Sequence, residues 1–505
     1  MKPILYLCAL ALVCGTNALA QAATVHVAQR LRSIECPKEI AKSGDDVRFG
    51  AMVATFRPGE AAANGLGVPG HAGKTLLLAS APFAGGKDRR NGGCVAVLDA
   101  VSGECLNVLW APFPMKAWKR GREVSQYEDM QFGMNFALSP EGGFLFVGTG
   151  FGGKGFVMNL AKGTWFEITH PLMQICRVEN DRIQPNNNSK LNPGTKAVFV
   201  DEQTLYLVSE TLTYHGAAAG SLAPGTLLFK VVFDPDKGVL SIHDPHKPQP
   251  TADQLAADLT PKRGYLTNRR KYPQGYGYRC DPQLDFHEGK LASTAFGIGT
   301  DSTMDVCAGS KHHFAACNAG SRLFAGEQPN HTPFLVRMSH AATGPRNRGD
   351  GIAVASDTNI RCYEQLEKAE CLPGGTRPTG LGMIDRFREI GWFSVESQLN
   401  TVEGRFGLFR WDSVFEKRVV RLEVEASQPE MNWRAMGGPE SGRSIDIRRT
   451  EVPWFYHHVD SATGLLYSGV CGEKLKGRRG AEPGQIHVFD LKPPLKELGW
   501  NEAAP

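Results

Sequence analysis

Lys74-Thr-Leu-Leu-Leu-Ala-Ser-Ala-Pro-Phe83 is a short apolar strand rich in small residues, and its pattern returns along the chain. In each copy, large apolar residues such as Leu, Val, Ile or Phe are combined with Ala, Ser, Thr or Gly. Self-similar units at a long period are typical of repeat proteins, and all-strand units are typical of a β-propeller. The other copies are Gly143-Phe-Leu-Phe-Val-Gly-Thr-Gly-Phe151, Leu205-Tyr-Leu-Val-Ser-Glu-Thr-Leu212, Lys290-Leu-Ala-Ser-Thr-Ala-Phe-Gly297, Gly351-Ile-Ala-Val-Ala-Ser-Asp357 and Leu465-Leu-Tyr-Ser-Gly-Val-Cys471.

The spacing of these strands predicts the size of the propeller. We assign them as the inner strands of the blades, beginning near residues 76, 144, 205, 290, 351 and 465, and Ile390-Gly-Trp-Phe-Ser-Val-Glu396 fills the remaining gap. The sequence therefore predicts an all-β fold, a single seven-bladed propeller over residues 25–495 with units of roughly 65 residues. Six or eight blades are the alternatives. Gly484-Gln-Ile-His-Val-Phe-Asp490 is expected to pair with a strand near Val25-His-Val27 and close the ring.

Hairpin turns support the repeat. Asp or Asn is followed four residues later by Gly in several places, where the polar side chain caps the turn and Gly takes a left-handed conformation. These turns are Asp99–Gly103, Asn159–Gly163, Asp234–Gly238, Asp285–Gly289 and Asp460–Gly464.

The N-terminus predicts export. Lys2 supplies a positive charge, residues 4–14 are apolar, and Ala18-Leu19-Ala20 is a cleavage site of the Ala-x-Ala type. Residues 1–20 are therefore expected to be a cleaved signal peptide, and the mature chain is expected to be secreted or periplasmic. No later stretch is long enough to span a membrane. The net charge of +4 is too small to indicate a nucleic-acid partner.

The cysteines are expected to form disulfides, because an exported chain meets an oxidising compartment. Ten of the 12 cysteines follow the signal peptide, and three pairs are close in sequence. Cys36, Cys176, Cys280 and Cys471 cannot be paired from the sequence. The predicted pairs are Cys94 with Cys105, Cys307 with Cys317, and Cys362 with Cys371.

Two segments resemble a known repeat. Phe49-Gly50 precedes Leu76-Leu-Leu-Ala-Ser-Ala-Pro82 and Gly92-Gly-Cys-Val-Ala-Val-Leu98, and Phe132-Gly133 precedes Phe144-Leu-Phe-Val-Gly148 and Gly155-Phe-Val-Met158. Both resemble FG-GAP repeats, the blade unit of the integrin α-subunit propeller. Gly469 with Gly484-Gln-Ile-His-Val488 is a looser match, so the resemblance covers about three blades. It implies a propeller that binds other proteins.

Metal ligands are sparse. FG-GAP blades often carry an Asp-rich calcium loop, and the nearest segment here is Asp281-Pro-Gln-Leu-Asp285, which has too few carboxylates for the six or more oxygens that calcium needs. No cofactor is predicted, with calcium at this loop as the less favoured alternative. His312-His313 and His457-His458 are adjacent pairs, and neighbours on a strand point to opposite faces, so neither pair chelates as a unit.

A basic, tyrosine-rich stretch is the predicted binding surface. It lies in the longest gap between blades, so residues 243–280 are expected to form an insertion on one rim. Tyr offers rigid contact area and Arg offers paired donors, which suits a protein or an acidic glycan. The predicted contact residues are Arg263, Tyr265, Arg269, Arg270, Tyr272, Tyr276 and Tyr278.

Linear motifs of enzymes are lacking: the sequence holds no Gly-x-Ser-x-Gly elbow, phosphate loop or His-Glu-x-x-His. The sequence therefore favours an exported binding or adhesion module over an enzyme, with no catalytic residue assigned. The alternative is a periplasmic propeller enzyme of the lactonase or dehydrogenase-subunit type, with its site at the mouth of the central channel.

Overall fold

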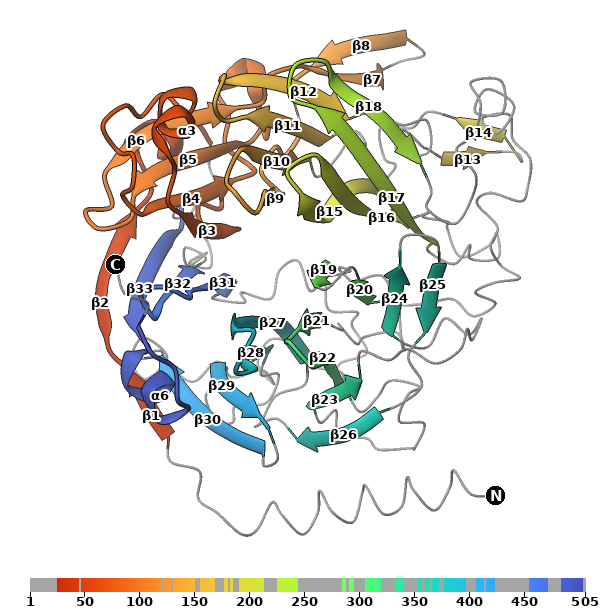
Figure 1. The fold of residues 1–505 in the computed structure, drawn as a ribbon. Coiled ribbons are helices and arrows are strands. Elements are labelled where there is room, and N and C mark those ends of the chain that lie inside the picture. Colours follow the sequence, from red (N-terminus) through yellow and green to blue (C-terminus); the bar gives the residue numbers. More distant parts are fainter. Residues whose placement is uncertain are drawn as a thin grey trace, which may run out of the picture.

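The computed structural model folds the chain into a ring of β-sheets (Figure 1). In the described part of the chain, six sheets have four strands, one has five and two have two. The described residues are 25–44, 47–119, 122–128, 130–149, 155–168, 177–179, 182–184, 190–212, 225–243, 284–287, 290–294, 305–318, 333–339, 352–356, 359–362, 366–371, 377–396, 406–412, 415–422, 454–470 and 483–502.

The first three large sheets are built from consecutive strands. Going outward from the centre of the ring in Figure 1, their strands follow one another in chain order. The first consists of β3 (Val53–Phe56), β4 (Leu76–Ala81), β5 (Cys94–Asp99) and β6 (Cys105–Trp110), the second of β9 (Asn135–Leu138), β10 (Phe144–Gly148), β11 (Gly155–Asn159) and β12 (Thr164–Ile168), and the third of β15 (Lys190–Asp201), β16 (Thr204–Leu212), β17 (Gly225–Asp234) and β18 (Gly238–His243).

The next two sheets exchange chain order, because β21, β22 and β23 lie in sequence between two paired strands of the other sheet. One sheet has the order β19-β20-β24-β25 and the other β21-β22-β23-β26. Their strands are β19 (Leu284–His287), β20 (Lys290–Thr294), β24 (Ile352–Ser356) and β25 (Asn359–Cys362), and β21 (Asp305–Ala308), β22 (His312–Asn318), β23 (Pro333–Ser339) and β26 (Leu366–Cys371).

The last two large sheets include the N-terminal strands. The five-stranded sheet ends with β1 and the following sheet ends with β2. Their strands are β27 (Arg377–Asp385), β28 (Ile390–Glu396), β29 (Phe406–Trp411), β30 (Phe415–Leu422) and β1 (Val25–Ala28), and β31 (Trp454–Asp460), β32 (Leu465–Val470), β33 (Gln485–Asp490) and β2 (Arg30–Glu35). The remaining elements are the hairpins β7 (Met115–Lys119) with β8 (Arg122–Gln126) and β13 (Arg177–Glu179) with β14 (Arg182–Gln184), and the short helices α2 (Lys38–Ala41), α3 (Glu60–Gly65), η1 (Lys87–Arg89) and α6 (Lys492–Glu497).

The innermost strands contact one another around the ring. β9 contacts β15, β15 contacts β19, β19 contacts β21, β21 contacts β27, β27 contacts β31, and β31 contacts β3. The β3–β6 and β9–β12 sheets meet through Met52, whose sulfur accepts a hydrogen bond from the Phe136 amide at 3.2 Å. The fold is a β-propeller, and the number of blades stays a prediction.

The hydrophobic core is divided among the gaps between neighbouring sheets. Along β4, Leu76 and Leu78 pack towards the β9–β12 sheet, whereas Leu77 and Ala79 pack towards the sheet that contains β32 and β33. Since every residue of β4 is buried, the strand reads as a continuous apolar run rather than an alternating one.

This double burial corrects the assignment of inner strands. The apolar strands that begin near residues 76, 144, 205, 290, 390 and 465 are the second strands of their sheets, and the strand near 351 is the third strand of its sheet. The innermost strands are β3, β9, β15, β19, β21, β27 and β31. A second or third strand has neighbours on both edges and sheets on both faces, which accounts for its apolar sequence.

The N-terminal segment closes the ring. β2 pairs antiparallel with β33, with Ile34 opposite Ile486, and β1 pairs parallel with β30 of the neighbouring sheet. Closure by the strand Gln485–Asp490 is therefore as expected, but its partner is Arg30–Glu35 and not the strand near Val25. One continuous segment thus supplies the outermost strand of two adjacent sheets.

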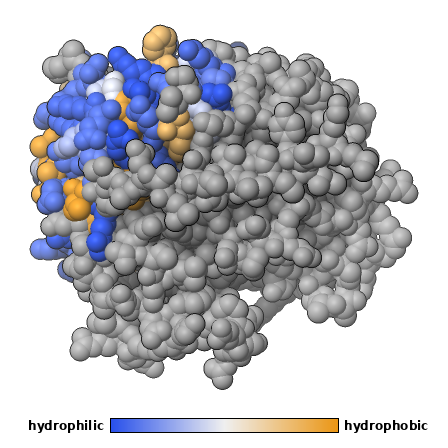
Figure 2. Space-filling model, turned by 90° about the horizontal axis from the view of Figure 1, so that it is seen from below, coloured by the Kyte–Doolittle hydropathy of each residue, from blue (hydrophilic) through white to orange (hydrophobic). Residues whose placement is uncertain are grey.

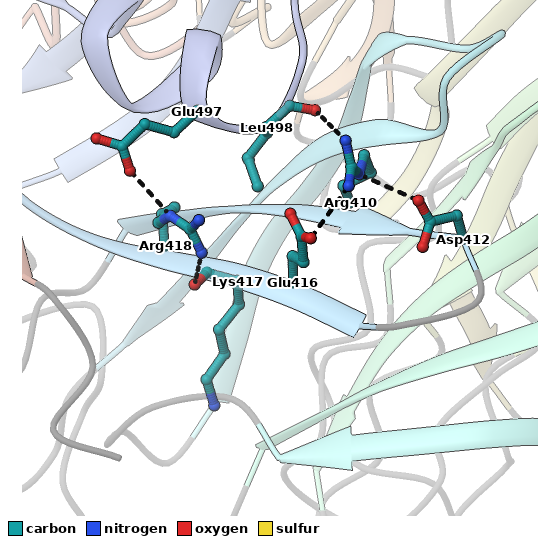
Figure 3. A network of polar contacts seen from close by, with 7 residues as sticks. All are labelled: Arg410, Asp412, Glu416, Lys417, Arg418, Glu497 and Leu498. Carbon is teal, nitrogen blue, oxygen red and sulfur yellow. Dashed lines mark hydrogen bonds and ion pairs between the residues drawn. The ribbon is translucent and has the colours of Figure 1, made fainter.

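The C-terminal helix α6 fastens this closure (Figure 3). Arg418 on β30 donates from Nε to Glu497 at 3.1 Å, and Nε2 of His26 on β1 lies 3.2 Å from the same carboxylate. Arg410 on β29 donates to the Leu498 carbonyl at 3.0 Å and to Glu416 at 3.1 Å, and its Nε lies 3.3 Å from Asp412. Three strands of one sheet, β1, β29 and β30, are thereby tied to Glu497 and Leu498.

Two equivalent Phe-Gly turns join successive sheets. Phe49-Gly50 precedes β3, and Phe132-Gly133 precedes β9; in both, Gly has a φ near +90° (86° and 91°) and the residue before Phe is also left-handed, Arg48 at 53° and Gln131 at 54°. The Phe49 amide donates to the Pro483 carbonyl at 2.8 Å, and the Phe132 amide donates to the Gly92 carbonyl at 2.9 Å.

These contacts place each Phe-Gly turn against the residues just before the third strand of the preceding sheet. The two segments that resemble FG-GAP repeats therefore share one backbone conformation, although membership of that family is not shown.

The Asp/Asn–Gly hairpin turns are confirmed where the structure describes them. Gly103 donates its amide to the Asp99 carbonyl at 2.8 Å, and the Asp99 carboxylate accepts the amides of Val101 and Ser102. Gly163, Gly238 and Gly464 likewise have positive φ values. A Gly is required there because other residues are strained in this conformation.

Two of the three predicted cystines are not formed, because Cys94, Cys105 and Cys307 are free thiols, whereas the pair Cys362–Cys371 stays a prediction. Cys94 lies opposite Trp110, whereas Cys105 lies opposite Leu98, so the two cysteines are about 13 Å apart along the hairpin, far beyond the reach of a disulfide. Cys307 lies opposite Phe314, three positions from Cys317 on the same strand. Cys362 and Cys371 belong to two different sheets. Strand register, which sequence proximity does not reveal, separates the first two pairs.

A glycine substitution tests the Phe-Gly packing. A Cβ atom at Gly469 on β32 would lie 1.9 Å from the Gly50 carbonyl oxygen, so Gly469→Ala forces the two sheets apart. We expect a loss of roughly 2–4 kcal/mol in unfolding free energy, measured by urea titration.

Gly59→Ala is the matched control, because a Cβ atom there meets nothing within 4 Å and Gly59 has a φ of −68°. We expect this control to change stability by less than about 1 kcal/mol. Equal stability of the two variants would contradict the close packing.

Candidate binding surface

The predicted contact residues Arg263, Tyr265, Arg269, Arg270, Tyr272, Tyr276 and Tyr278 lie outside the described residues, as do the signal peptide and most of the 243–280 insertion. The ends of that insertion are nevertheless placed, since β18 ends at His243 and β19 begins at Leu284. Antiparallel strands alternate in direction, so the outermost strand of a blade ends on the same side of a propeller as the innermost strand of the next blade begins.

The described loops on that side form a basic surface. They are the segment before β3, the β4–β5 connection and the segment between β6 and β9, and hydrogen bonds join the first two, from Gly85 N to Ser43 Oγ at 2.9 Å and from Phe83 N to the Val47 carbonyl at 3.4 Å. We call the following residues the basic face: Arg48, Phe83, Lys87, Arg89, Arg90 and Tyr127.

Two arginines of the basic face stack on aromatic rings. The Arg48 guanidinium lies 4.3 Å from the Phe83 ring centroid, and the Arg89 guanidinium lies 4.0 Å from that of Tyr127. Arg89 also donates to the Ala111 carbonyl at 3.3 Å. Stacking on a ring restricts the orientation of a planar guanidinium. The side chains of these two arginines are therefore restricted in conformation.

Charge is unbalanced on this surface. Lys87 and Arg90 are exposed, and Arg90, with its side chain 67% exposed, pairs with Glu128 at 2.7 Å. Over the three loop segments, residues 36–52, 82–93 and 111–134, the sequence has 10 Lys and Arg against 7 Asp and Glu, and the β4–β5 connection has three basic residues against Asp88 alone. The surplus of positive charge favours an anionic group.

Sequence analysis missed the basic face. Each stack joins residues 35 or 38 positions apart, Arg48 with Phe83 and Arg89 with Tyr127, so no local pattern reveals it. The run Lys87-Asp-Arg-Arg90 between two apolar strands was the available signal.

A second polar cluster lies inside the sheet of β31, β32, β33 and β2, which we call the closing sheet. Ser33, His487, Ser468 and His457 occupy one row across β2, β33, β32 and β31. Ser33 Oγ lies 2.8 Å from Nδ1 of His487, and Ser468 Oγ lies 2.7 Å from Nδ1 of His457. A serine beside an imidazole can be a nucleophile with its base, but Ser468 has no exposed surface, so no substrate reaches it. The Ser468–His457 pair is therefore structural.

The adjacent histidines His457 and His458 point to opposite faces of β31, as expected for neighbours on a strand. His457 packs against the Phe406 ring, with centroids 5.3 Å apart, whereas Nε2 of His458 accepts the Thr55 amide at 3.2 Å and lies 2.9 Å from the Thr55 hydroxyl. Each histidine therefore joins the closing sheet to a different neighbour.

On the side opposite the basic face, two carboxylates accept hydrogen bonds from the backbone of a neighbouring hairpin. Glu389, in the β27–β28 turn, accepts the amides of Lys311 and His312 at 2.8 and 2.9 Å, and its other oxygen lies 2.9 Å from Nδ1 of His312. Glu202, in the β15–β16 turn, accepts the Glu141 and Gly143 amides at 2.6 and 3.2 Å. These contacts lock adjacent sheets and leave the carboxylates occupied.

Among the described residues, no group of three or more His, Cys, Asp or Glu side chains is placed to hold a metal ion. Every helix in the same part of the chain is too short or too polar to cross a membrane. In Figure 2, which views the molecule from below, the coloured surface is mostly hydrophilic with small hydrophobic areas.

Comparisons with known proteins give the fold context. No protein-family model matches the chain, and no curated protein matches it. Similar solved structures are U3-55K (9% identity, TM-score 0.39, covering 92% of this chain and 98% of that one) and an oligogalacturonate lyase in complex with manganese (9%, 0.40, 92% and 98%).

A third similar structure is the β-propeller domain of Cps50 (Swd1) from Myceliophteria thermophila (9%, 0.36, 92% and 99%). With TM-scores of 0.40 or less in these three cases, the assignment to the β-propeller fold rests on the ring of contacting sheets.

Protonation of the buried histidines sets the expected acid sensitivity. Burial lowers the pKa of His457 to about 3 and that of His458 to about 4, and burial together with Arg30 lowers the pKa of His487 to about 4. Unfolded histidines titrate near pH 6.5, so below that pH the unfolded state binds more protons than the folded one. Stability is therefore complete above pH 6.5 and falls as the pH drops towards 4.

We predict that His457→Asn reduces this acid sensitivity. Each buried histidine lowers the unfolding free energy by about 2 kcal/mol between pH 7 and pH 5, and the variant should lose that much less than the wild type in urea titrations at both pH values. Ser468→Ala is the control, because it removes the hydrogen bond to His457 and keeps the imidazole, so its loss between the two pH values should match the wild type. Identical pH dependence of His457→Asn and the wild type would contradict the buried, neutral state.

Proposed function

We propose that this chain is an exported, seven-bladed β-propeller that binds an acidic partner, a protein or an anionic glycan, through its basic face. Each of the seven larger sheets is one blade in this proposal. The observation that carries it is the pair of arginines held on aromatic rings, Arg48 on Phe83 and Arg89 on Tyr127, on one side of the ring.

Positioned arginines suit this function because binding costs less when the donors are already oriented. A guanidinium held against a ring loses less freedom on binding, and a guanidinium can offer two N–H donors to one carboxylate or sulfate. Exposed Lys87 and Arg90 add attraction at longer range, which speeds association.

The location supports the same function. The basic and tyrosine-rich stretch lies in sequence between the end of β18 and the start of β19. Both of these points belong to the side of the ring that carries the basic face. Propellers bring loops of several blades together on one side, so a partner there can contact more than one blade. Arg263, Arg269 and Arg270 and the tyrosines between residues 265 and 278 remain the proposed second part of this surface.

Charge reversal tests the proposal. The double variant Arg89→Glu/Arg90→Glu should weaken binding to immobilised heparin and to poly-glutamate by roughly tenfold or more at about 0.15 M salt, because it replaces two attractions by two repulsions. The measurement is the dissociation constant from biosensor titrations, with circular dichroism to confirm the fold.

Lys162→Glu/Lys237→Glu is the matched control, since both lysines lie in turns between third and fourth strands, on the other side of the ring. We expect the control to lose less than about threefold. Equal losses would mean that binding follows net charge and not the basic face. Binding of heparin but not poly-glutamate would identify a glycan partner, and the reverse a protein partner.

The enzyme alternative predicts a different outcome. Affinity capture from the native compartment combined with metal analysis of the mature protein separates the two functions. Stoichiometric metal without a captured partner would favour a catalytic propeller over a binding module.

A further inference from the structure

We propose that Cys36 and Cys105 form a disulfide that bonds the closing strand β2 to the neighbouring β3–β6 sheet. Neither the sequence distance nor the cysteine order indicates this pair. It replaces the pair Cys94–Cys105, which the register of β5 and β6 separates.

The path of β2 along the neighbouring sheet brings the two cysteines to the same level. Arg32 donates from its guanidinium to the Ala100 carbonyl, and the Ile34 side chain lies against Gly103, where a Cβ atom would be 3.2 Å from it. Cys36 follows Ile34 by two residues, and Cys105 follows Gly103 by two residues. The two cysteines, which are free thiols in the structure, thus follow directly on the contacts between the sheets.

Side-chain direction agrees with this placement. Arg32, Ile34 and Cys36 alternate with Ser33 and Glu35, so they point to one face of β2, and Ile34 and Cys36 are buried. Cys105 lies opposite Leu98, and directly opposed residues share a face. Cys36, Ile34 and Leu98 belong to one hydrophobic cluster between the two sheets, and Cys105 packs against that cluster.

The chemistry favours formation during folding. Burial raises the pKa of Cys36 to about 12 and that of Cys105 to about 11, so the folded thiols form little reactive thiolate. In an oxidising compartment, oxidised glutathione can react before the sheets pack. The two thiols lose their protons and form one S–S bond, and two electrons pass to oxidised glutathione, which becomes two glutathione thiols carrying those protons.

The bond would secure the closure of the ring. It encloses β3, β4 and β5 in a covalent loop and ties β2 to a sheet of which it is not a strand. Constraining a long loop of the unfolded chain stabilises the folded state.

Peptide mapping tests the proposal. The full chain is refolded in a buffer of reduced and oxidised glutathione, its remaining thiols are alkylated, and it is digested without reduction. Trypsin releases Cys36 in residues 33–38, and a Glu-specific protease cuts after Glu104, between Cys94 and Cys105. We expect residues 36–38 or 33–38 to be linked to a fragment that begins at Cys105. Linkage of Cys36 to Cys94, linkage of Cys94 to Cys105, or alkylation of Cys36 and Cys105 would each overturn the proposal.

Serine variants give an independent readout. Cys36→Ser and Cys105→Ser should each lose the linked peptide and lower the melting temperature by about 5 °C relative to the oxidised wild type, and dithiothreitol should then have little further effect on either variant. Cys94→Ser, in the same cluster, should keep the linked peptide and its response to dithiothreitol. The wild-type map decides the proposal even where a serine variant fails to fold.

Discussion

Pairing of the N-terminal strands β1 and β2 with β30 and β33 is the constraint on which the ring depends. Each sheet in the ring packs only against the sheet on either side of it. Without closure, two sheets would therefore expose a face and an edge. The same ten or so residues serve both adjacent sheets, and α6 fastens the partner strand of β1 through Arg418 and Glu497. Closure, the packing of the histidine row and the proposed cystine all meet at β2.

Small residues make the remaining sheets fit together. Gly50, Gly469 and Ser80 allow backbone to approach backbone where the Phe-Gly turns enter the ring, and a Cβ atom at Gly469 would collide with the Gly50 carbonyl. This requirement explains why the repeated strands are rich in Ala, Ser and Gly. A small polar residue can also satisfy backbone donors at such a contact, as with Ser80 Oγ, which accepts a hydrogen bond from the Met52 amide at 2.8 Å.

The sequence predicts what local patterns determine. The strands, the Asp–Gly turns and the closure by Gln485–Asp490 follow from composition and turn chemistry, so they could be predicted. Contacts between residues far apart in the sequence could not be predicted in this way. Double-sided burial made β4 look innermost, strand register separated Cys94 from Cys105, and the stacking of Arg48 on Phe83 joins residues with no shared local signal. The order of β20 and β24, separated by three strands of another sheet, has no counterpart in the repeat pattern.

Hydrogen–deuterium exchange of the full chain tests closure most directly. If β2 is an integral strand, residues 30–35 should exchange as slowly as their partner residues 485–490 and as the core strand β5, because all of them open only when the ring opens. Rapid exchange of residues 30–35 beside a protected β5 would show a frayed terminus and contradict the closed ring.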